Sequence, residues 1–549
     1  MAGAAAAALM LGASPGAAAR LGMSDAARTY VRARAAAMTG DHARAAQLLA
    51  ALADAQPDQA DIARKALSEA IGAGDMGLAL RLARTVPAAK LPIDARLLLA
   101  SEEIRRRHPE RAAQWLAQTG DNGDLTFLVP LISGWTSAER GDQAQALGAF
   151  DQVTNRSLLG PVEAEERAFM LLKFRRTAEA EALARQAVGR AGVRESRLRQ
   201  ALADAFLAAG DKPRALMIVE GMGAGEAAAR QRIAAGKNGG QAVDNLSEAL
   251  SEVLTAFAGD LMRVQPGSPP IGLLQVARYA NPQNGSATAL LALLLARQDR
   301  DEEALALLRS VPAGDASMSQ VRDMQVRILR DEKKDAEAYR IAAAAASSPD
   351  ADFADFSRLG DVFQSMKRHN EAADAYARAI ASAQAQKLDG QLWSLLLLRA
   401  SALEDAGRWP EARAALQQAL TLAPDQPLLL NFLGYAKLER GEDMDAAEAM
   451  IRKASDLAPD EASITDSLGW AQFKRGKVDE AIATLQRAAE KDPAQAEIQE
   501  HLGDALFRSG RRYEARFAWS ASLVTAEDEI AARVKAKLTS GLTPANAAP

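Results

Sequence analysis

Cysteine is absent from the sequence, and its absence excludes disulfide bonds, thiolate zinc sites and a cysteine nucleophile. Aromatic residues make up only 5% of the chain, and strand-forming runs of Val, Ile and Thr are scarce. Outside the N-terminal region, no stretch reaches the roughly 18 apolar residues that a helix needs to cross a bilayer. We therefore expect a helical protein whose mature chain has no transmembrane helix.

Net charge is also small. The 66 lysines and arginines nearly balance the 71 aspartates and glutamates, which gives a formal charge of −5 over 549 residues. Binding to nucleic-acid phosphates needs a basic stripe, so nucleic acid is not expected as a partner. A chain of this length exceeds a single compact core, which leaves several domains or one elongated array.

Sequence patterns typical of enzymes are missing. The four histidines, His42, His108, His369 and His501, lie far apart, and none has the spacing of a metal ligand. No HExxH string occurs, and the glycines at 221–225 lack the third glycine of a dinucleotide-binding fingerprint. We therefore expect no enzymatic activity, no cofactor and no metal, and we expect the histidines to be structural or solvated.

What the sequence does contain is repetition. In a recurring helix-turn-helix setting, a glycine is followed five residues later by an alanine at seven places. The pairs are Gly40/Ala45, Gly74/Ala79, Gly141/Ala146, Gly210/Ala215, Gly407/Ala412, Gly476/Ala481 and Gly510/Ala515. This recurrence is typical of a protein built from repeated units, and it favours an extended binding surface over a catalytic pocket.

The period is clearest near the C-terminal end. Three prolines are separated by 35 and 34 residues, and each is followed ten residues later by a glycine. They are Pro424 with Gly434, Pro459 with Gly469, and Pro493 with Gly503. This period, with its fixed spacing from proline to glycine, resembles that of the tetratricopeptide repeat (TPR). The resemblance implies an all-α fold, namely an α-solenoid of stacked helix-turn-helix hairpins wound into a right-handed superhelix.

Each residue of this repeat signature has a mechanical explanation. Small residues in the first helix of a unit let it approach the second helix closely, and a larger side chain there would overpack the contact at a cost of roughly 1–3 kcal/mol. Alanines in the second helix act in the same way, and the prolines end that helix. The other signature residues are Gly360, Ala372, Ala412, Ala447, Ala481 and Ala515. Asp425 and Asp460, which follow two of the prolines, are predicted N-caps of the next helix.

The repeat pattern divides the chain into segments. We expect residues 24–220 to form about six degenerate TPR-like hairpins. Residues 221–281 are expected to be a divergent helical segment and loop that act as a hinge. The TPR array resumes over 282–526 and is clearest over 353–526. Residues 527–540 are expected to form a polar capping helix, and 541–549 a disordered tail.

The N-terminus allows two interpretations. Residues 1–22 begin with an uncharged, alanine-rich stretch that resembles a secretory signal peptide, although the usual basic segment is missing. The alternative is a disordered leader on a cytoplasmic protein. In Leu430–Tyr435, Asp466–Trp470 and Glu514–Trp519, the C-terminal third also resembles a group of exported proteobacterial TPR proteins of mostly unknown role. That resemblance favours a periplasmic location.

The resemblance to TPR proteins also implies a binding surface. The first helix of each unit lines the inner surface of such a superhelix, and residues three or four apart share its exposed face. The matching residues are Asn431, Tyr435, Asp466, Trp470, Phe473, Glu500, Asp504 and Phe507. This groove would be aromatic and acidic, and it would suit an extended peptide with apolar anchors and some positive charge. Alternatively, Tyr435 and Trp470 fill gaps between adjacent repeats.

Together these features predict a non-enzymatic scaffold that binds partner proteins or extended peptide segments in the groove, with a role in envelope assembly. The alternative is an accessory or regulatory subunit that contacts one enzyme through residues 221–281. A stand-alone enzyme is the least favoured interpretation.

Overall fold

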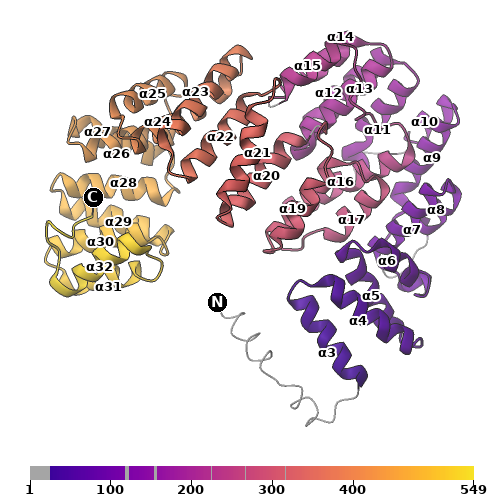
Figure 1. Ribbon diagram of the computed structural model, residues 1–549, viewed down its shortest axis with the longest axis horizontal. Helices are drawn as coiled ribbons and strands as arrows, with labels where there is room; N and C mark the ends of the chain where they lie inside the picture. Colours follow the sequence, from indigo (N-terminus) through magenta and orange to yellow (C-terminus); the bar gives the residue numbers. More distant parts are fainter. Residues whose placement is uncertain are drawn as a thin grey trace. The chain divides into compact units, whose positions relative to one another are not determined.

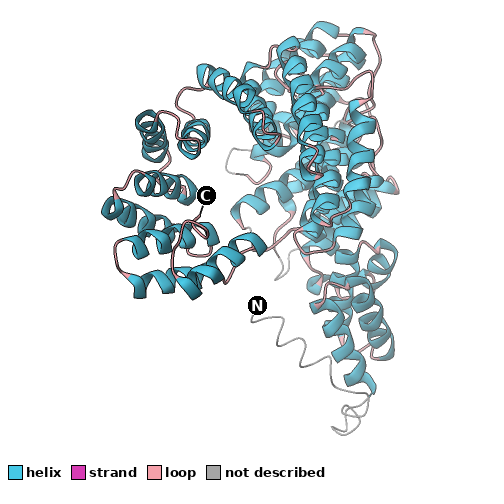
Figure 2. Ribbon diagram, turned by 60° about the vertical axis from the view of Figure 1, so that its left-hand side comes forward, coloured by secondary structure: helices cyan, strands magenta, loops and turns pink. Residues whose placement is uncertain are grey.

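In the computed structural model, the described residues are 25–117, 123–151, 153, 157–223, 225–265, 267–315 and 317–548. Helices are the regular elements throughout these ranges, and no strand occurs in them (Figure 2). The expected all-α fold of helical hairpins is therefore confirmed. Within the same ranges, no helix combines the length and the apolar character needed to cross a membrane. The expected signal peptide or leader, residues 1–22, lies outside the described residues.

The chain divides into two compact units between α21 (Asp335–Ala346) and α22 (Phe353–Ser365), with helices labelled as in Figure 1. Unit 1 is Met1–Asp350 and unit 2 is Ala351–Pro549. The boundary does not coincide with the predicted hinge at 221–281, which lies inside unit 1.

Consecutive helical hairpins form the first part of unit 1. Among the described residues, twelve α-helices precede the divergent segment, and each pairs with its neighbour to give six hairpins. They are α3 (Asp25–Met38), α4 (His42–Ala55), α5 (Ala60–Ala73), α6 (Met76–Ala83), α7 (Ile93–Arg105), α8 (Pro109–Ala117), α9 (Val129–Glu139), α10 (Gln143–Gly148), α11 (Gly160–Lys173), α12 (Thr177–Arg190), α13 (Glu195–Ala208) and α14 (Lys212–Ile218). Short 3₁₀ turns lie at η1 (Ala88–Lys90), η2 (Thr126–Leu128) and η3 (Gly192–Arg194).

The glycines of the Gly/Ala pairs explain how these hairpins turn. Gly74 ends α5 with a φ of 77°, a left-handed conformation that glycine adopts at little cost. The next residue, Asp75, caps α6 because its carboxylate accepts a hydrogen bond from the Leu78 N–H at 2.9 Å. The same order of glycine and capping aspartate begins α4 at Asp41. The sequence therefore stops one helix and starts the next within two residues.

The divergent segment packs inside unit 1. It contains α15 (Glu226–Ala234), α16 (Leu246–Val264) and α17 (Ile271–Ala280). Helix α16 lies against α7, α9 and α11, while α17 lies against α5 and α7. The Tyr279 hydroxyl donates a hydrogen bond to Glu102 at 2.6 Å, and the Leu246 N–H donates one to Glu139 at 2.7 Å. The segment is thus part of the core of unit 1, and the expectation of a hinge there is corrected.

Buried ion pairs hold this packing together. Arg194 lies 2.9 Å from Glu165 of α11 and 3.4 Å from Glu252 of α16. Arg197 of α13 lies 2.7 Å from Glu252 and 3.4 Å from Asp315, which precedes α20. Burial by itself lowers the pKa of Arg194, but the surrounding carboxylates outweigh burial and raise it. Two more hairpins complete the unit: α18 (Gly285–Ala296) with α19 (Asp301–Arg309), and α20 (Met318–Asp331) with α21.

Unit 2 is a regular stack of hairpins. Its helices after α22 are α23 (His369–Ala385), α24 (Asp389–Asp405), α25 (Trp409–Leu422), α26 (Pro427–Glu439), α27 (Met444–Leu457), α28 (Ala462–Lys474), α29 (Val478–Lys491), α30 (Ala496–Arg508), α31 (Arg512–Ser522) and α32 (Asp528–Ser540). Each even-numbered helix from α22 to α30 packs on the helix that follows it. Helix α32 packs on both α30 and α31, at the place where the capping helix was expected.

The glycines and alanines of the repeat signature lie where the helices of each hairpin meet. A Cβ added to Gly503 would lie 2.3 Å from Trp519, and one added to Gly469 would lie 2.6 Å from Leu485. Gly360 and Gly434 are equally close to their partner helices. The signature alanines are all fully buried: Ala372, Ala412, Ala447, Ala481 and Ala515. These small residues set the short distance between the two helices of each hairpin.

Helix ends in unit 2 follow the prediction only in part. Helices α25, α27 and α29 each end two residues before a signature proline. The predicted caps do not form, because α26 and α28 begin after Gln426 and Glu461, and neither side chain caps its helix. Asp425 instead forms an ion pair with Lys453 at 2.7 Å.

Candidate functional site

Eight residues of unit 2 form what we call the first-helix face. They are the predicted groove residues on α26, α28 and α30: Asn431, Tyr435, Asp466, Trp470, Phe473, Glu500, Asp504 and Phe507. Helix α28 packs against both α26 and α30, so the structure brings the three helices together. Repetition every 34 or 35 residues places equivalent positions of these helices next to one another.

Trp470 lies between adjacent repeats. It is only 1% exposed, and its ring stacks on that of His501 in α30, with centroids 4.1 Å apart. On its own helix it stacks on Phe473 at 4.9 Å. Of the two interpretations of Trp470, packing between repeats is therefore the one that the structure shows.

Tyr435 is more accessible than Trp470. It is half-buried and packs against the hydrophobic cluster that contains Leu438, Trp470 and Ala471. Burial raises the pKa of Tyr435, and the negative charges of Glu439, Glu497 and Asp466 raise it further. Its hydroxyl is thus neutral at physiological pH.

A buried ion pair joins α28 to α30 beside this stack. Nδ1 of His501 lies 2.9 Å from Asp466. Burial lowers the pKa of His501, but the charge and the hydrogen bond of Asp466 outweigh burial, so the pKa is raised above the ordinary value. The other ring nitrogen, Nε2, is buried without a hydrogen-bond partner. The sequence predicts only a structural or solvated role for His501, although its spacing of 35 residues from Asp466 indicates one repeat.

The other acids of the first-helix face pair with α32. Lys537 is fully buried, and its Nζ lies 2.7 Å from both Glu500 and Asp504. Arg533 adds a second partner to Glu500 at 2.9 Å. Burial raises the pKa of Glu500, but the hydrogen bonds from Arg533 and Lys537 outweigh burial and lower it. The sequence pattern leads us to expect that these acids attract a positively charged partner. In the structure they are instead already paired with Lys537 and Arg533 of the same chain.

Segment 541–548 lies on the same face. The backbone N–H of Ala548 donates a hydrogen bond to Oδ2 of Asp504 at 3.3 Å. The Ala548 side chain is 5% exposed and belongs to the hydrophobic cluster of Trp470. Gly541 packs so closely on Phe507 that an added Cβ would lie 2.7 Å from the ring. The prediction of a disordered tail is therefore wrong for residues 541–548, and sequence composition gave no sign of these contacts.

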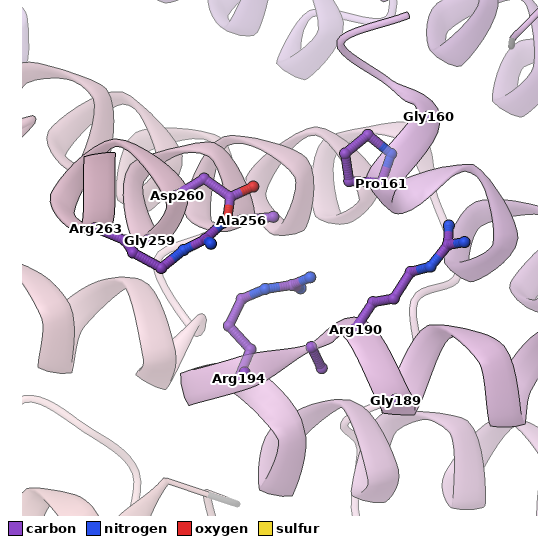
Figure 3. Close-up of a pocket in the computed structure, with 11 residues that line it drawn as sticks. Gly160, Pro161, Gly189, Arg190, Arg194, Ala256, Gly259, Asp260 and Arg263 are labelled. Carbon is purple, nitrogen blue, oxygen red and sulfur yellow. The ribbon is translucent and has the colours of Figure 1, made fainter. Parts of the chain in front are cut away.

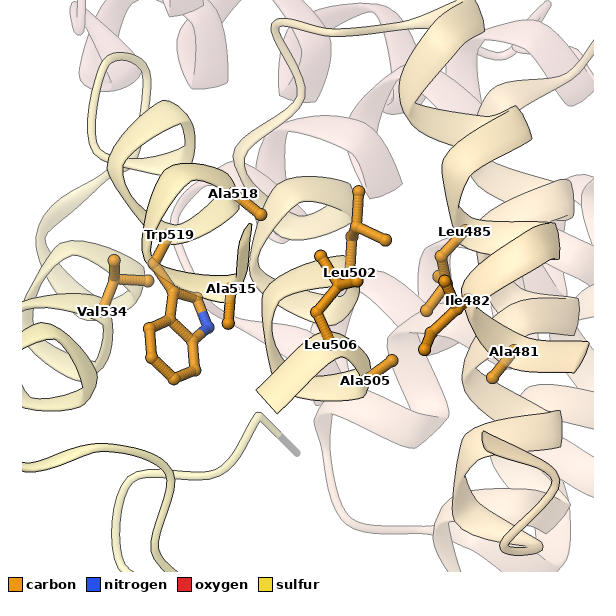
Figure 4. Close-up of a cluster of buried hydrophobic side chains, with 10 residues drawn as sticks. All are labelled: Ala481, Ile482, Leu485, Leu502, Ala505, Leu506, Ala515, Ala518, Trp519 and Val534. Carbon is orange, nitrogen blue, oxygen red and sulfur yellow. The ribbon is translucent and has the colours of Figure 1, made fainter. Parts of the chain in front are cut away.

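The remaining predicted residues lie around this centre. Phe507 is half-buried, and its ring centroid lies 5.4 Å from that of Trp519. It packs against the hydrophobic cluster whose ten buried members Figure 4 shows. Asn431 is half-buried, and its Oδ1 is a buried acceptor without a hydrogen-bond partner. The first-helix face thus combines aromatic surface with one unmatched polar atom, Oδ1 of Asn431, and His501, which stacks on Trp470 of this face, adds a second, Nε2.

A pocket in unit 1 is a second candidate. It has a volume of about 690 Å³ and lies between the start of α11, the end of α12 and α16 (Figure 3). Arg190, Arg194 and Arg263 border it. Arg194 is engaged by buried carboxylates, and Arg263 pairs with Asp260 at 2.9 Å. Because two of these three arginines already pair with carboxylates of the chain, the pocket offers a weaker case for a ligand than the first-helix face. No group of residues suited to hold a metal ion occurs in the described part of the chain.

Comparison with known families identifies the repeats. A family model described as tetratricopeptide repeat matches residues 393–438, and another described as TPR repeat matches residues 469–510. Both ranges lie in unit 2 and include parts of α26, α28 and α30. No curated protein matches the chain.

Several solved structures are similar at low identity. The APC/C hetero-tetramer Cut9–Hcn1 shares 16% identity, with 96% of this chain and 98% of that chain covered and a TM-score of 0.36. A TPR protein from Parabacteroides merdae shares 14% identity over 47% of this chain and 98% of its own, with a TM-score of 0.37. YrrB, described as a TPR protein with an unusual peptide-binding site, shares 16% identity over 36% of this chain and 97% of its own, with a TM-score of 0.27.

Two segments of unit 2 match tetratricopeptide-repeat models, and the helical hairpins with their closely packed glycines and alanines agree with that match. The chain therefore contains tetratricopeptide repeats at residues 393–438 and 469–510.

Proposed function

We propose that this protein is a non-enzymatic scaffold that binds a segment of another polypeptide on the first-helix face of unit 2. The observation that carries the proposal is the packing of residues 541–548 on this face; we call the surface that they cover the seat. This face holds a short non-helical stretch of chain through one backbone N–H, given to Asp504, and one small side chain, that of Ala548. Backbone hydrogen bonds combined with side-chain contacts are the usual means by which proteins recognise peptides.

The unmatched polar atoms support the same class of ligand. Nε2 of His501 and Oδ1 of Asn431 are buried without partners. A buried polar group that lacks a hydrogen bond costs about 1–3 kcal/mol. The raised pKa of His501 favours the protonated ring, in which Nε2 is a donor, while Asn431 offers an acceptor. A peptide group supplies one carbonyl acceptor and one N–H donor, so a polypeptide that reaches these buried atoms can satisfy both.

The ligand proposed here is apolar and uncharged at its centre. Glu500 and Asp504 are already paired with Lys537, and Asp466 is paired with His501. A cationic side chain would have to displace these buried pairs, which is unfavourable. The aromatic surface of Tyr435 and Phe473 is the part left for side-chain anchors.

For the cellular setting, we propose export to the periplasm and a role in envelope assembly. The alanine-rich residues 1–22 support this proposal, as they resemble a signal peptide. Mass spectrometry of the mature protein tests it. A mature chain that begins near residue 20 supports export, whereas an intact N-terminus on protein isolated from the cytoplasm contradicts it.

The binding proposal is tested by affinity capture with the full chain and quantitative mass spectrometry. Tyr435→Arg places a long charged side chain on the first-helix face, and we expect it to reduce recovery of the bound polypeptide at least tenfold. Tyr513→Arg is the matched control, because Tyr513 is 76% exposed on α31. Circular dichroism shows whether both variants remain folded. Equal recovery with the two variants would reject this face as the binding site.

The alternative is an accessory subunit that contacts an enzyme through the divergent segment. It is supported by the exposed end of α16, where Val264 is 68% exposed beside Leu261. Deletion of the whole segment would remove part of the core of unit 1, so a point substitution is the better test. Val264→Asp should abolish capture if this alternative holds, while Val524→Asp at an exposed position of unit 2 should not.

A further inference from the structure

We propose that residues 541–548 are an intramolecular occupant of the first-helix face, which a partner polypeptide has to displace. This inference rests on the proposed function, since it assigns to that binding surface a competitor within the same chain. Groove and occupant both belong to unit 2.

The segment is anchored first at Gly541. This residue follows α32 directly and has a φ of 77°, which side chains other than glycine adopt at a cost. An added Cβ would also meet Cζ of Phe507 at 2.7 Å. The next residue, Leu542, packs against the hydrophobic cluster that includes Trp519 and Val534. Both the conformation and the contact therefore direct the chain onto the face.

Asn546 then fixes the path of the segment. Its Oδ1 accepts a hydrogen bond from the Thr543 N–H at 2.7 Å, and its Nδ2 donates one to the Gly541 carbonyl at 2.9 Å. The Asn546 N–H donates to the Thr543 carbonyl at 3.2 Å, which closes a turn. Asn546 is buried, so its side chain forms hydrogen bonds within the segment instead of with solvent. The turn returns the chain toward α28 and α30.

The segment ends in the centre of the face. Ala548 donates its N–H to Asp504 and packs with Trp470, whereas its neighbour Ala547 is exposed. This alternation of one buried and one exposed residue is the pattern of a bound peptide. Asp504 also accepts hydrogen bonds from Lys537 and from Trp519. The segment therefore shares Asp504 with the ion pairs that hold α32 in place.

The seat is small compared with a protein interface. Its contacts come mainly from Gly541, Leu542, Asn546 and Ala548, and residues 544, 545 and 547 are exposed. A stable protein–protein interface involves some 20–30 residues on each side. A partner with more contacts can therefore displace the segment. The segment is thus suited to exclude ligands of low affinity, while ligands of high affinity still bind. The ligand that fits is a polypeptide stretch with a small side chain at the position of Ala548.

Thiol labelling tests the seat directly, because the natural chain has no cysteine. Ala548→Cys and Ala547→Cys each introduce one thiol in adjacent positions of the full chain. We expect a maleimide to label Cys at 548 at least tenfold more slowly than at 547. Equal rates would overturn the inference. The slow rate should be independent of protein concentration, and a rate that rises on dilution would assign the seat to a second copy of the chain and so overturn the intramolecular form.

A peptide with the sequence of residues 541–548 tests the competition. Ala548→Arg places a side chain that the seat cannot hold, so it should open the face and increase binding of a fluorescein-labelled peptide at least tenfold over the unchanged chain. Ala547→Arg is the control and should bind the peptide no better than the unchanged chain. Equal binding by all three proteins would overturn the inference. If the labelling and peptide results are as expected but Tyr435→Arg leaves capture unchanged, the proposed function fails while the occupancy stands.

Discussion

The imidazole of His501 in α30 stacks on the indole of Trp470 in α28, with ring centroids 4.1 Å apart and planes within 10°. The same imidazole pairs with Asp466, one helical turn before Trp470, at 2.9 Å. Two neighbouring repeats are thus joined by one residue that stacks and forms an ion pair. The joint lies in the middle of the first-helix face, so the stability of unit 2 and the shape of its binding surface depend on the same contacts.

Loss of this joint should be costly. His501→Ala leaves the carboxylate of Asp466 buried without its partner, and breaking a buried pair in this way costs about 3–5 kcal/mol. We expect a lower urea midpoint for unit 2, measured by circular dichroism. His108→Ala is the control, since the side chain of His108 is 48% exposed. A difference of less than about 1 kcal/mol between the two variants would contradict the role of the pair.

Stability of unit 2 should fall as the pH rises above neutrality. The pKa of His501 is raised in the folded protein by Asp466, with smaller contributions from Glu497 and Asp504. A histidine with a raised pKa stabilises the fold fully below its unfolded pKa of about 6.5, and this stabilisation is lost as pH rises through the folded value. Urea unfolding from pH 6 to 9 should show the loss, and Asp466→Asn should remove most of it. An identical pH profile in parent and variant would refute this assignment.

Gly503 should not tolerate a methyl group. Its Cβ would lie 2.3 Å from Trp519, so Gly503→Ala should destabilise unit 2 by roughly 1–3 kcal/mol through overpacking. Gly390 in α24 has open space around it. Gly390→Ala should therefore stabilise unit 2 or leave its stability unchanged, because alanine favours a helix over glycine by up to ~1 kcal/mol. Thermal unfolding compares the two. A stabilised Gly503→Ala protein would show that the close approach of the helices is not required.

Lys537 should matter far more than its neighbour on α32. Lys537→Met leaves Glu500 and Asp504 without their shared cation, and we expect a loss of about 3–5 kcal/mol for a broken buried pair. Lys535→Met changes an exposed lysine on the same helix and should have an effect below about 0.5 kcal/mol. Hydrogen exchange of α32 in the two variants provides the measurement. Similar exchange rates in both variants would argue against the buried network.

Much of the fold is predictable from the sequence because its cause is local and repeated. The close contacts of Gly434, Gly469 and Gly503 recur with the period of the repeat, so one physical reason explains all of them. For the candidate site, the sequence predicts which positions share a face but not which of their side chains are exposed. Its positions follow from the repeat, but whether Trp470 faces a ligand or a neighbouring repeat depends on His501 of the next repeat.

Other features depend on contacts that no local pattern carries. Helix α17 packs on α5, where Gln275 reaches the carbonyl of Gly72 across 203 positions of sequence. The seat of residues 541–548 depends on where Phe507 and Asp504 lie in space, while Gly541 and Asn546 have the composition of an ordinary loop. The acids on α30 looked available in the sequence because their partners come from α32, after the last repeat.

Site-specific photocrosslinking tests the central claim most directly, namely that the first-helix face of unit 2 binds polypeptide. A benzophenone amino acid replaces Tyr435 on α26 or, as control, the exposed Tyr513 on α31, and products formed in the cell are mapped by mass spectrometry. The account predicts crosslinks from position 435 to a recurring segment of a partner and to residues 541–548, with neither product from position 513. Equal crosslinking from both positions, or none from position 435, would contradict it.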